Sequence, residues 1–139
     1  MTWVVDTCVV IDVLEDDPSF GLRSATLLEQ KIGEGLSICP VTFVELAPAF
    51  EGDLGEQERF LELAGIEFRT AWSAADTRAA HHAWHLHIAT RRAGILPKRP
   101  IADVFIGAYA SNQRGIITRN SKDFRHNFPD LEILDPCAP

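Results

Sequence analysis

The feature that most constrains the fold is a repeated alternation between short apolar runs and longer segments with helical periodicity. The apolar runs are expected to be strands, and they lie at Trp3–Val5, Leu36–Pro40, Ile66–Arg69, Gly115–Thr118 and Leu131–Leu134. Helices are expected between them at residues 9–14, 19–32, 42–50, 54–63, 73–92 and 101–111, with a turn at 120–124. Because strands that alternate with helices form a parallel sheet covered on both faces, the sequence predicts an α/β fold with a central parallel sheet of four to five strands flanked by helices.

Length and composition are those of an ordinary globular domain. With 139 residues, 46% of them hydrophobic and 24% charged, the chain is expected to form one domain over residues 1–139 with a buried core. The start has no secretory-signal pattern, and no apolar run reaches the roughly 18 residues of a membrane span. Three cysteines without metal-type spacing indicate free thiols in a reducing compartment, so a cytoplasmic location without membrane attachment is expected.

Charge is distributed unevenly along the chain. The net charge is −7, yet nine of the 13 Lys and Arg residues lie between Arg78 and His126, a stretch that contains only two acidic residues. This stretch is either a solvated basic face or a phosphate-binding half, because positive clusters supply affinity for nucleic-acid backbones. On the second interpretation, the candidates for nucleic-acid contact are Arg91, Arg92, Lys98, Arg99, Arg119 and Lys122.

Four acidic residues lie at comparable places in the expected layout of strands and helices. Asp6 ends the first strand, Glu45 and Asp103 lie in the first turns of helices, and Asp123 lies in the turn after a later strand. Parallel strands present their carboxyl ends at one edge of a sheet, so these side chains can converge there. Carboxylates on a half-buried edge repel one another unless a cation is present, and Mg²⁺ favours carboxylate oxygen. The pattern indicates a divalent-metal site for phosphoryl chemistry with water as the nucleophile.

Each of these acids also has a purely structural interpretation. Asp is a common helix-capping and turn residue, and the helix dipole favours an acid in the first turn. Thr42 and Glu45 match a capping box, in which the acid only hydrogen bonds to its own helix start. Two histidines, His81 and His85, share one helix face and could bind a transition metal, although a surface position explains the same spacing. The joint placement of the four acids favours the metal site.

Four motifs in order resemble those of the PIN-domain nucleases, and most of all the VapC toxins of bacterial toxin–antitoxin pairs. They are Val5-Asp6-Thr7-Cys8, Thr42-x-x-Glu45-Leu46, Ala102-Asp103-Val104-Phe105 and Thr118-Arg119-Asn120-Ser121-Lys122-Asp123-Phe124, and the resemblance covers nearly the whole chain. It implies a PIN fold and an Mg²⁺- or Mn²⁺-dependent endoribonuclease that hydrolyses RNA with a metal-activated water. It also implies a homodimer, a cognate antitoxin that neutralises it, and tRNA or rRNA as substrate.

Carried over to this chain, the resemblance assigns a role to each of the four acids. Asp6 and Asp103 would be direct metal ligands. Glu45 and Asp123 would hold metal-bound waters or a second ion, so all four would be catalytic. Some relatives carry an acid at the position of Asn120. Because this chain has Asn there, Asp123 is assigned as the fourth carboxylate.

Polar and thiol positions beside the acids both match and depart from the family pattern. Thr7 and Thr118 match the flanking hydroxyl positions. Cys8 stands where relatives often have Asn or Ser, and a thiol is the weaker hydrogen-bond partner. Cys8 and Asn120 therefore keep open a non-catalytic module that binds RNA or protein. A phosphatase is also open, although position 8 is not the second Asp of an Asp-x-Asp nucleophile motif.

Overall fold

The computed structural model describes residues 1–92 and 101–138, with the side chains of Arg91 and Arg92 outside that description. A five-stranded sheet with the strand order β3-β2-β1-β4-β5 forms its centre, and every neighbouring pair is parallel. The strands are β1 (Trp3–Val5), β2 (Leu36–Ser37), β3 (Ile66–Glu67), β4 (Gly115–Ile117) and β5 (Ile133–Leu134). The α/β fold with a parallel sheet is confirmed, although most strands are shorter than their apolar runs.

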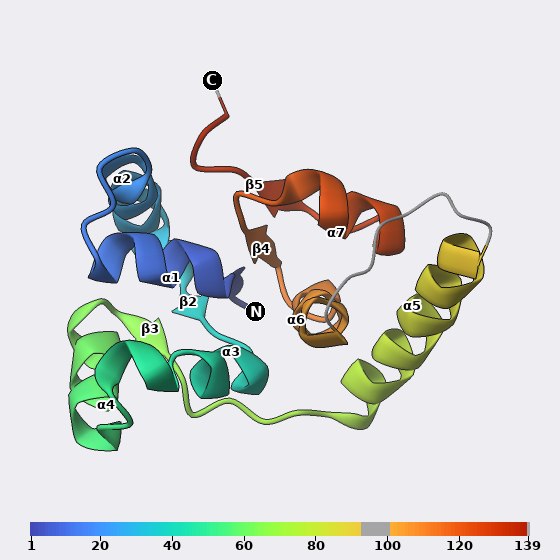
Figure 1. Ribbon diagram of the computed structural model, residues 1–139, viewed down its shortest axis with the longest axis horizontal. Helices are drawn as coiled ribbons and strands as arrows, with labels where there is room; N and C mark the ends of the chain where they lie inside the picture. The colour runs from blue at the N-terminus through green and yellow to red at the C-terminus, as the bar shows by residue number, and fades with distance from the viewer. Residues whose placement is uncertain (93–100, 139) are drawn as a thin grey trace.

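Seven α-helices and two 3-10 helices connect the strands within the described residues. They are α1 (Thr7–Leu14), α2 (Gly21–Lys31), η1 (Ile32–Glu34), α3 (Pro40–Glu45), η2 (Ala47–Phe50), α4 (Leu54–Leu63), α5 (Ala74–Arg92), α6 (Ile101–Ser111) and α7 (Ser121–Asn127). Figure 1 shows α1 to α4 on one side of the sheet region, and α5 to α7 on the other. None of these helices has the length and apolar character needed to cross a membrane.

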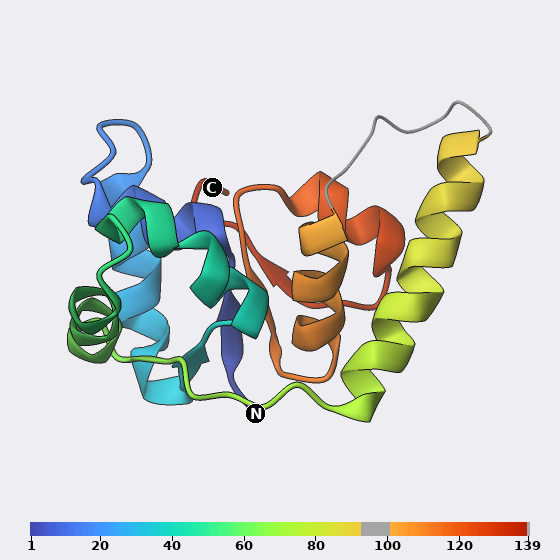
Figure 2. The ribbon, with the colours of Figure 1, turned by 60° about the horizontal axis from the view of Figure 1, so that its bottom comes forward.

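Two apolar clusters cover the two faces of the sheet. Successive strand residues point to opposite faces, so Val5 packs with α1, α2 and α4, whereas Val4 packs with α5, α6 and α7. In Figure 2, α6 lies between the sheet and the long helix α5. Because strands β1 and β4 are buried on both faces, they read as continuous apolar runs in the sequence.

The two central strands end side by side. Val5 pairs with Ile117, and the Asp6 backbone N–H donates to the Ile117 carbonyl at 3.0 Å. The next residues of the two strands, Asp6 and Thr118, therefore lie together at the carboxyl edge of the sheet. This edge of an open parallel sheet is where such folds place their ligands.

The expected turn at residues 120–124 is wrong, because this segment belongs to helix α7. Its polar residues favour a turn when they are read alone. Phe124 and Phe128, four residues apart, are both buried, and the Phe128 N–H donates to the Phe124 carbonyl at 2.9 Å. Packing of this apolar pair explains why the segment is helical despite its polar start.

The expected helix over residues 42–50 begins earlier and is interrupted. Helix α3 begins at Pro40, where a missing N–H costs nothing, and it ends at Glu45. Pro48 cannot donate to the carbonyl four residues before it, so the chain continues as the 3-10 helix η2. Glu45 is therefore the last residue of its helix and does not lie in the first turn.

Candidate metal centre

Asp6 is the buried centre of the site. It is only 3% exposed, it caps the start of α1, and its Oδ1 accepts the Thr7 backbone N–H at 2.8 Å. Its Oδ2 accepts the Thr118 hydroxyl at 2.7 Å and the Cys8 thiol at 3.4 Å. The capping interpretation of Asp6 is thus correct, but capping occupies only one of its two oxygens. The other oxygen is held by donors from β4 and α1.

The Asp6 carboxyl is under electrostatic stress in the absence of a cation. Burial raises its pKa above the ordinary value of 3.8, and the nearby charge of Asp103 raises it further. Hydrogen bonds from Thr118, Cys8 and Thr7 act in the opposite direction because they favour the ionised form. A divalent cation would relieve both the repulsion and the loss of hydration, so the surroundings of Asp6 fit a hard cation.

Asp103 supplies the second carboxylate from a different element. It lies half-buried in the first turn of α6, a helix whose following residues are nearly all buried. The charge of Asp103 acts on Asp6, so the structure brings together two acids that are 97 residues apart in the chain. These are the two residues that the family resemblance assigns as direct ligands.

Glu45 is held by the hydroxyl of Thr7, the residue that follows Asp6. The Thr7 hydroxyl donates to Glu45 Oε1 at 2.7 Å, and the buried Thr42 hydroxyl lies 3.0 Å from the same Thr7 oxygen. The capping box proposed for Thr42 and Glu45 does not form, because Cys39 is the residue before α3 and no side chain caps that helix. Thr42 is a positioning residue that the sequence reading placed only in the cap.

Asp123 and its neighbours lie on α7, beyond β4. Asp123 and Lys122 are exposed in the first turn of this helix, and Asn120 precedes it. The Asn120 N–H donates to the Thr118 hydroxyl oxygen at 3.0 Å, which connects α7 to the site. Within the part of the chain that the structure describes, no three acidic, His or Cys side chains gather closely enough to hold a metal ion. The role of Asp123 stays a prediction.

The thiol of Cys8 is a donor to the site and remains protonated. Burial, with the negative charge of Asp6 beside it, raises the pKa of Cys8 to about 12. In this environment the thiol contributes a hydrogen bond to Asp6. The substitution of Cys for the usual Asn or Ser preserves a donor, although a weak one.

The six basic residues expected to contact nucleic acid have different environments. Lys98 and Arg99 lie outside the described residues, as do the side chains of Arg91 and Arg92. Lys122 is exposed on α7. Arg119 is different, because its guanidinium makes a bidentate ion pair with Asp12 of α1 and lies over the Phe20 ring at 4.1 Å.

Asp12 is the residue that the sequence reading missed. It is 4% exposed, and it is the one acid of the apolar helix α1. A charged residue buried in an apolar helix almost always has a partner, and this is the signal that could have identified it. Its partner Arg119 could not be deduced from spacing, because 107 residues separate the two.

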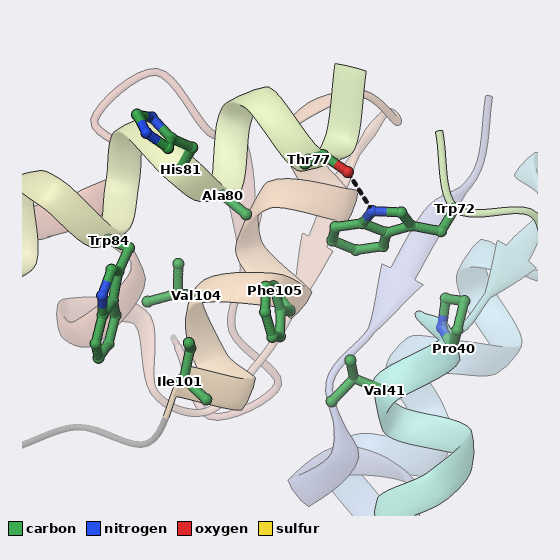
Figure 3. Close-up of a pocket in the computed structure, with 10 residues that line it drawn as sticks. All are labelled: Pro40, Val41, Trp72, Thr77, Ala80, His81, Trp84, Ile101, Val104 and Phe105. Carbon is green, nitrogen blue, oxygen red and sulfur yellow. Dashed lines mark hydrogen bonds between the residues drawn. The ribbon is translucent and has the colours of Figure 1, made fainter. Parts of the chain in front are cut away.

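An apolar groove opens beside Asp103, between α5, α6 and the start of α3. It has a volume of about 470 Å³, and Figure 3 shows Trp72, Trp84, Ile101, Val104 and Phe105 around it. The Trp72 indole donates to the Thr77 hydroxyl at 2.8 Å and packs edge-on against Phe105. The groove could receive an apolar side chain.

The histidines of α5 do not form a second metal site in the described residues. His81 and His85 are exposed, and His81 lies at the rim of this groove. His87 is fully buried and stacks on Trp84. The surface interpretation therefore fits His81 and His85, and His87 belongs to the interior.

Comparison with known proteins shows the family. The sequence profile of the PIN domain matches residues 3–127, which include Asp6, Glu45, Asp103 and Asp123. The chain belongs to the PIN-domain family. A search of curated proteins finds no significant match to it.

Solved structures share the fold of this PIN domain at low sequence identity. FitAB bound to an IR36 DNA fragment matches with a TM-score of 0.72 and 16% identity, over 99% of this chain and 97% of that one. VapBC-1 from nontypeable Haemophilus influenzae matches with 0.68 and 18%, over 99% and 100%. DNA-bound VapBC from Salmonella typhimurium matches with 0.64 and 21%, over 99% of each chain. At these identities the likeness concerns the fold.

Proposed function

We propose that this PIN domain is a divalent-metal-dependent endoribonuclease of the VapC type, with Mg²⁺ or Mn²⁺ as cofactor. The observation that carries the proposal is the buried Asp6 carboxyl at the carboxyl edge of the sheet, near enough to Asp103 for that charge to raise its pKa. Two like charges at a half-buried edge are costly unless a cation compensates them. Membership of a nuclease family and the structural likeness to VapBC and FitAB support the same conclusion.

Each residue of the site has a definable part in that activity. When bound, a divalent cation supplies the polarisation of the phosphodiester and the activation of water that hydrolysis needs. Asp6 and Asp103 would hold it, and donors from Thr118, Cys8 and Thr7 orient Asp6 and favour its ionised form against the opposing effect of burial. Glu45, held by Thr7, is positioned to orient a water or accept its proton, and Asp123 completes the proposed acidic set.

RNA binding requires positive charge near these acids. Lys122 follows the site directly in the chain and is exposed, and Arg91, Arg92, Lys98 and Arg99 belong to the same basic stretch. These residues are proposed to contact phosphates and offset the repulsion between the acids and RNA. Arg119 is already paired with Asp12, so its proposed contact with RNA requires that this pair be shared or broken.

The proposal includes protein partners. The structural neighbours are complexes of two proteins, VapB with VapC and FitA with FitB. We infer that a cognate antitoxin neutralises this chain and that the PIN domain, residues 1–139, acts as a homodimer in the cytoplasm. tRNA and rRNA are the substrate classes to test first.

The test is cleavage of total RNA by the purified protein, with EDTA or with added Mg²⁺ or Mn²⁺. We expect discrete fragments with 5′-phosphate and 3′-hydroxyl ends, only with metal and only when Asp6 is intact. Asp6→Ala should abolish cleavage, whereas Glu29→Ala, which removes an exposed acid of α2, should leave it unchanged. RNA binding without cleavage under every metal condition would contradict the nuclease and indicate a binding module.

A further inference from the structure

A partly buried ion pair connects the segment after β4 to helix α1. Arg119 donates through Nε to Asp12 Oδ2 and through Nη2 to Asp12 Oδ1, the latter at 3.0 Å. The Ser24 hydroxyl lies 3.5 Å from Asp12 Oδ2, and the Phe20 ring covers the guanidinium. Two parallel N–H···O bonds fix orientation as well as distance, because the guanidinium and the carboxylate are both planar.

One chain neighbour of Arg119 contacts Asp6, and the other contacts that neighbour. Thr118 donates its hydroxyl to Asp6 Oδ2, and the Asn120 N–H donates to that same hydroxyl oxygen. The segment 118–120 therefore contacts the start of α1 through the Thr118 hydroxyl, and a point further along α1 through the Arg119 side chain.

Strand pairing alone does not fix this segment. The Thr118 N–H still donates to the Leu134 carbonyl, at 3.0 Å, but β4 ends at Ile117 and the chain then turns into α7. The direction of that turn decides whether the Thr118 hydroxyl reaches Asp6. Arg119 lies in this turn, and the ion pair between its side chain and Asp12 holds the turn against α1.

A purely stabilising role does not explain the choice of residues. Replacement of a buried ion pair by apolar residues of similar volume is often neutral or stabilising, so a charged pair is a poor way to gain stability alone. A bidentate pair supplies a fixed geometry, which a carboxylate that must present a free lone pair to a cation requires.

We propose that Asp12 and Arg119 are positioning residues of the metal centre, whose ion pair keeps the Thr118 hydroxyl on Asp6. This inference rests on the proposed function for the presence of a metal at Asp6. The link from Arg119 to Thr118 itself can be measured without metal.

The first measurement is hydrogen exchange of the Asn120 amide in the metal-free protein, since this amide reports directly on the Thr118 hydroxyl. We expect faster exchange in Arg119→Ala, and an intermediate rate in Arg119→Lys, which keeps Asp12 paired but cannot bond bidentately. Arg69→Ala is the matched control. Like Arg119, Arg69 pairs with an acid, Glu62, and its guanidinium lies over an aromatic ring, that of Phe68, at 4.2 Å. This pair lies on the other side of strands β2 and β3 from Asp6. Unchanged exchange in both Arg119 variants would overturn the inference.

The second measurement is Mn²⁺ affinity by isothermal titration. Loss of a residue that orients a metal ligand typically weakens metal binding by about tenfold or more, and we expect this for Arg119→Ala and for Thr118→Val. Because both act through one hydrogen bond, the double variant should bind no more weakly than either single one. Arg69→Ala should match the wild type.

The outcomes separate this inference from the proposed function. Additive losses of Mn²⁺ affinity in the double variant would show that the ion pair is only structural. Unchanged Mn²⁺ affinity in folded Arg119→Lys and Arg119→Ala variants would show the same. Absence of Mn²⁺ binding in the wild-type protein would contradict the proposed metal centre instead. In that case the exchange rate of the Asn120 amide would still decide whether the pair holds Thr118.

Discussion

At the scale of single residues, the site is defined by how each side chain is held. Asp6 is a capping residue, a hydrogen-bond acceptor from Thr118, and a neighbour of Asp103 at the same time. No single one of these contacts distinguishes a metal ligand from an ordinary helix cap. Their combination favours the proposed role as a metal ligand, because burial and a like charge raise the pKa of a carboxyl that three donors keep in place.

Asp6 should destabilise the metal-free fold at neutral pH. Its folded-state pKa is raised, so the folded protein binds this proton more tightly than the unfolded chain, and stability is lost as pH rises from about 3.8 through the raised pKa. Asp6→Asn, which keeps a capping oxygen, should therefore raise the metal-free stability at pH 7 by roughly 1 kcal/mol. Urea unfolding at several pH values measures this, and the gain should shrink as pH falls towards 3.8. A loss of stability at pH 7 would contradict the electrostatic argument.

Thr7 should matter through Glu45. Thr7→Val keeps the size of the side chain but removes the hydroxyl that joins Glu45 to the site. We expect RNA cleavage to fall by about tenfold with Mn²⁺ affinity little changed, because the effect falls on the orientation of Glu45 and spares Asp6 and Asp103. Thr26→Val removes a hydroxyl that bonds only to its own helix, and it should leave cleavage unchanged. If Thr7→Val and Thr26→Val cleave RNA equally well, the proposed role of Glu45 in the mechanism is contradicted.

At the scale of elements, the sheet edge and helix α6 decide where the acids meet. Helix α6 carries Asp103 at its first turn and lies against the sheet, and the close approach is made at Gly107. A Cβ atom at Gly107 would overlap the ring of Phe128, which belongs to the core on this face. Placement of Asp103 therefore depends on a glycine one turn further along the helix.

Gly107→Ala should destabilise the protein although alanine is the better helix former. The gain in helix propensity is about 1 kcal/mol, whereas overpacking of a filled core costs roughly 1–3 kcal/mol. A lower melting temperature is expected, and Phe128→Leu in the same chain should recover part of it. Gly33→Ala is the control, because a Cβ atom there meets no neighbour within 4 Å. A Gly107→Ala variant as stable as the wild type would contradict the described packing of α6.

Most elements could be predicted from the sequence, and the exceptions have physical reasons. The start of the expected helix over residues 73–92 is confirmed by a capping box of Ser73 and Asp76 with both hydrogen bonds in place, because such a signal is local. Helix α7 could not be predicted, because the packing of Phe124 and Phe128 against distant elements stabilises it. The expected position of Asp6 at the end of a strand is confirmed, whereas the Asp12 to Arg119 pair depends on side-chain directions that no local pattern encodes.

At the scale of the whole molecule, an acidic chain must bind an anionic polymer. The net charge is −7, so attraction to RNA has to come from the basic stretch between Arg78 and His126. The acids of the site lie within or next to the elements that carry this stretch. Binding of RNA should therefore depend on salt through a few phosphate contacts and not through the overall charge.

Lys122→Ala should weaken RNA binding and flatten its salt dependence. For single-stranded RNA, the loss of one phosphate contact reduces the slope of log affinity against log salt by about 0.7. Arg59→Ala removes an exposed base of α4, outside the basic stretch, and should leave the slope unchanged. Fluorescence anisotropy at salt concentrations from about 50 to 200 mM measures the slope for each variant, because the effect of salt is large in this range. Equal slopes for the two variants would remove Lys122 from the RNA-binding surface.

The most direct test of the account is Mn²⁺ binding measured by electron paramagnetic resonance, in the wild-type protein and in Asp6→Asn and Asp103→Asn. We expect the wild type to bind Mn²⁺ and each variant to bind it at least about tenfold more weakly, because each loses one of the two proposed ligands. Glu29→Gln, on the exposed face of α2, should bind like the wild type. Binding that survives unchanged in Asp103→Asn, or no binding by the wild-type protein, would contradict the claim that this carboxylate pair is a metal centre.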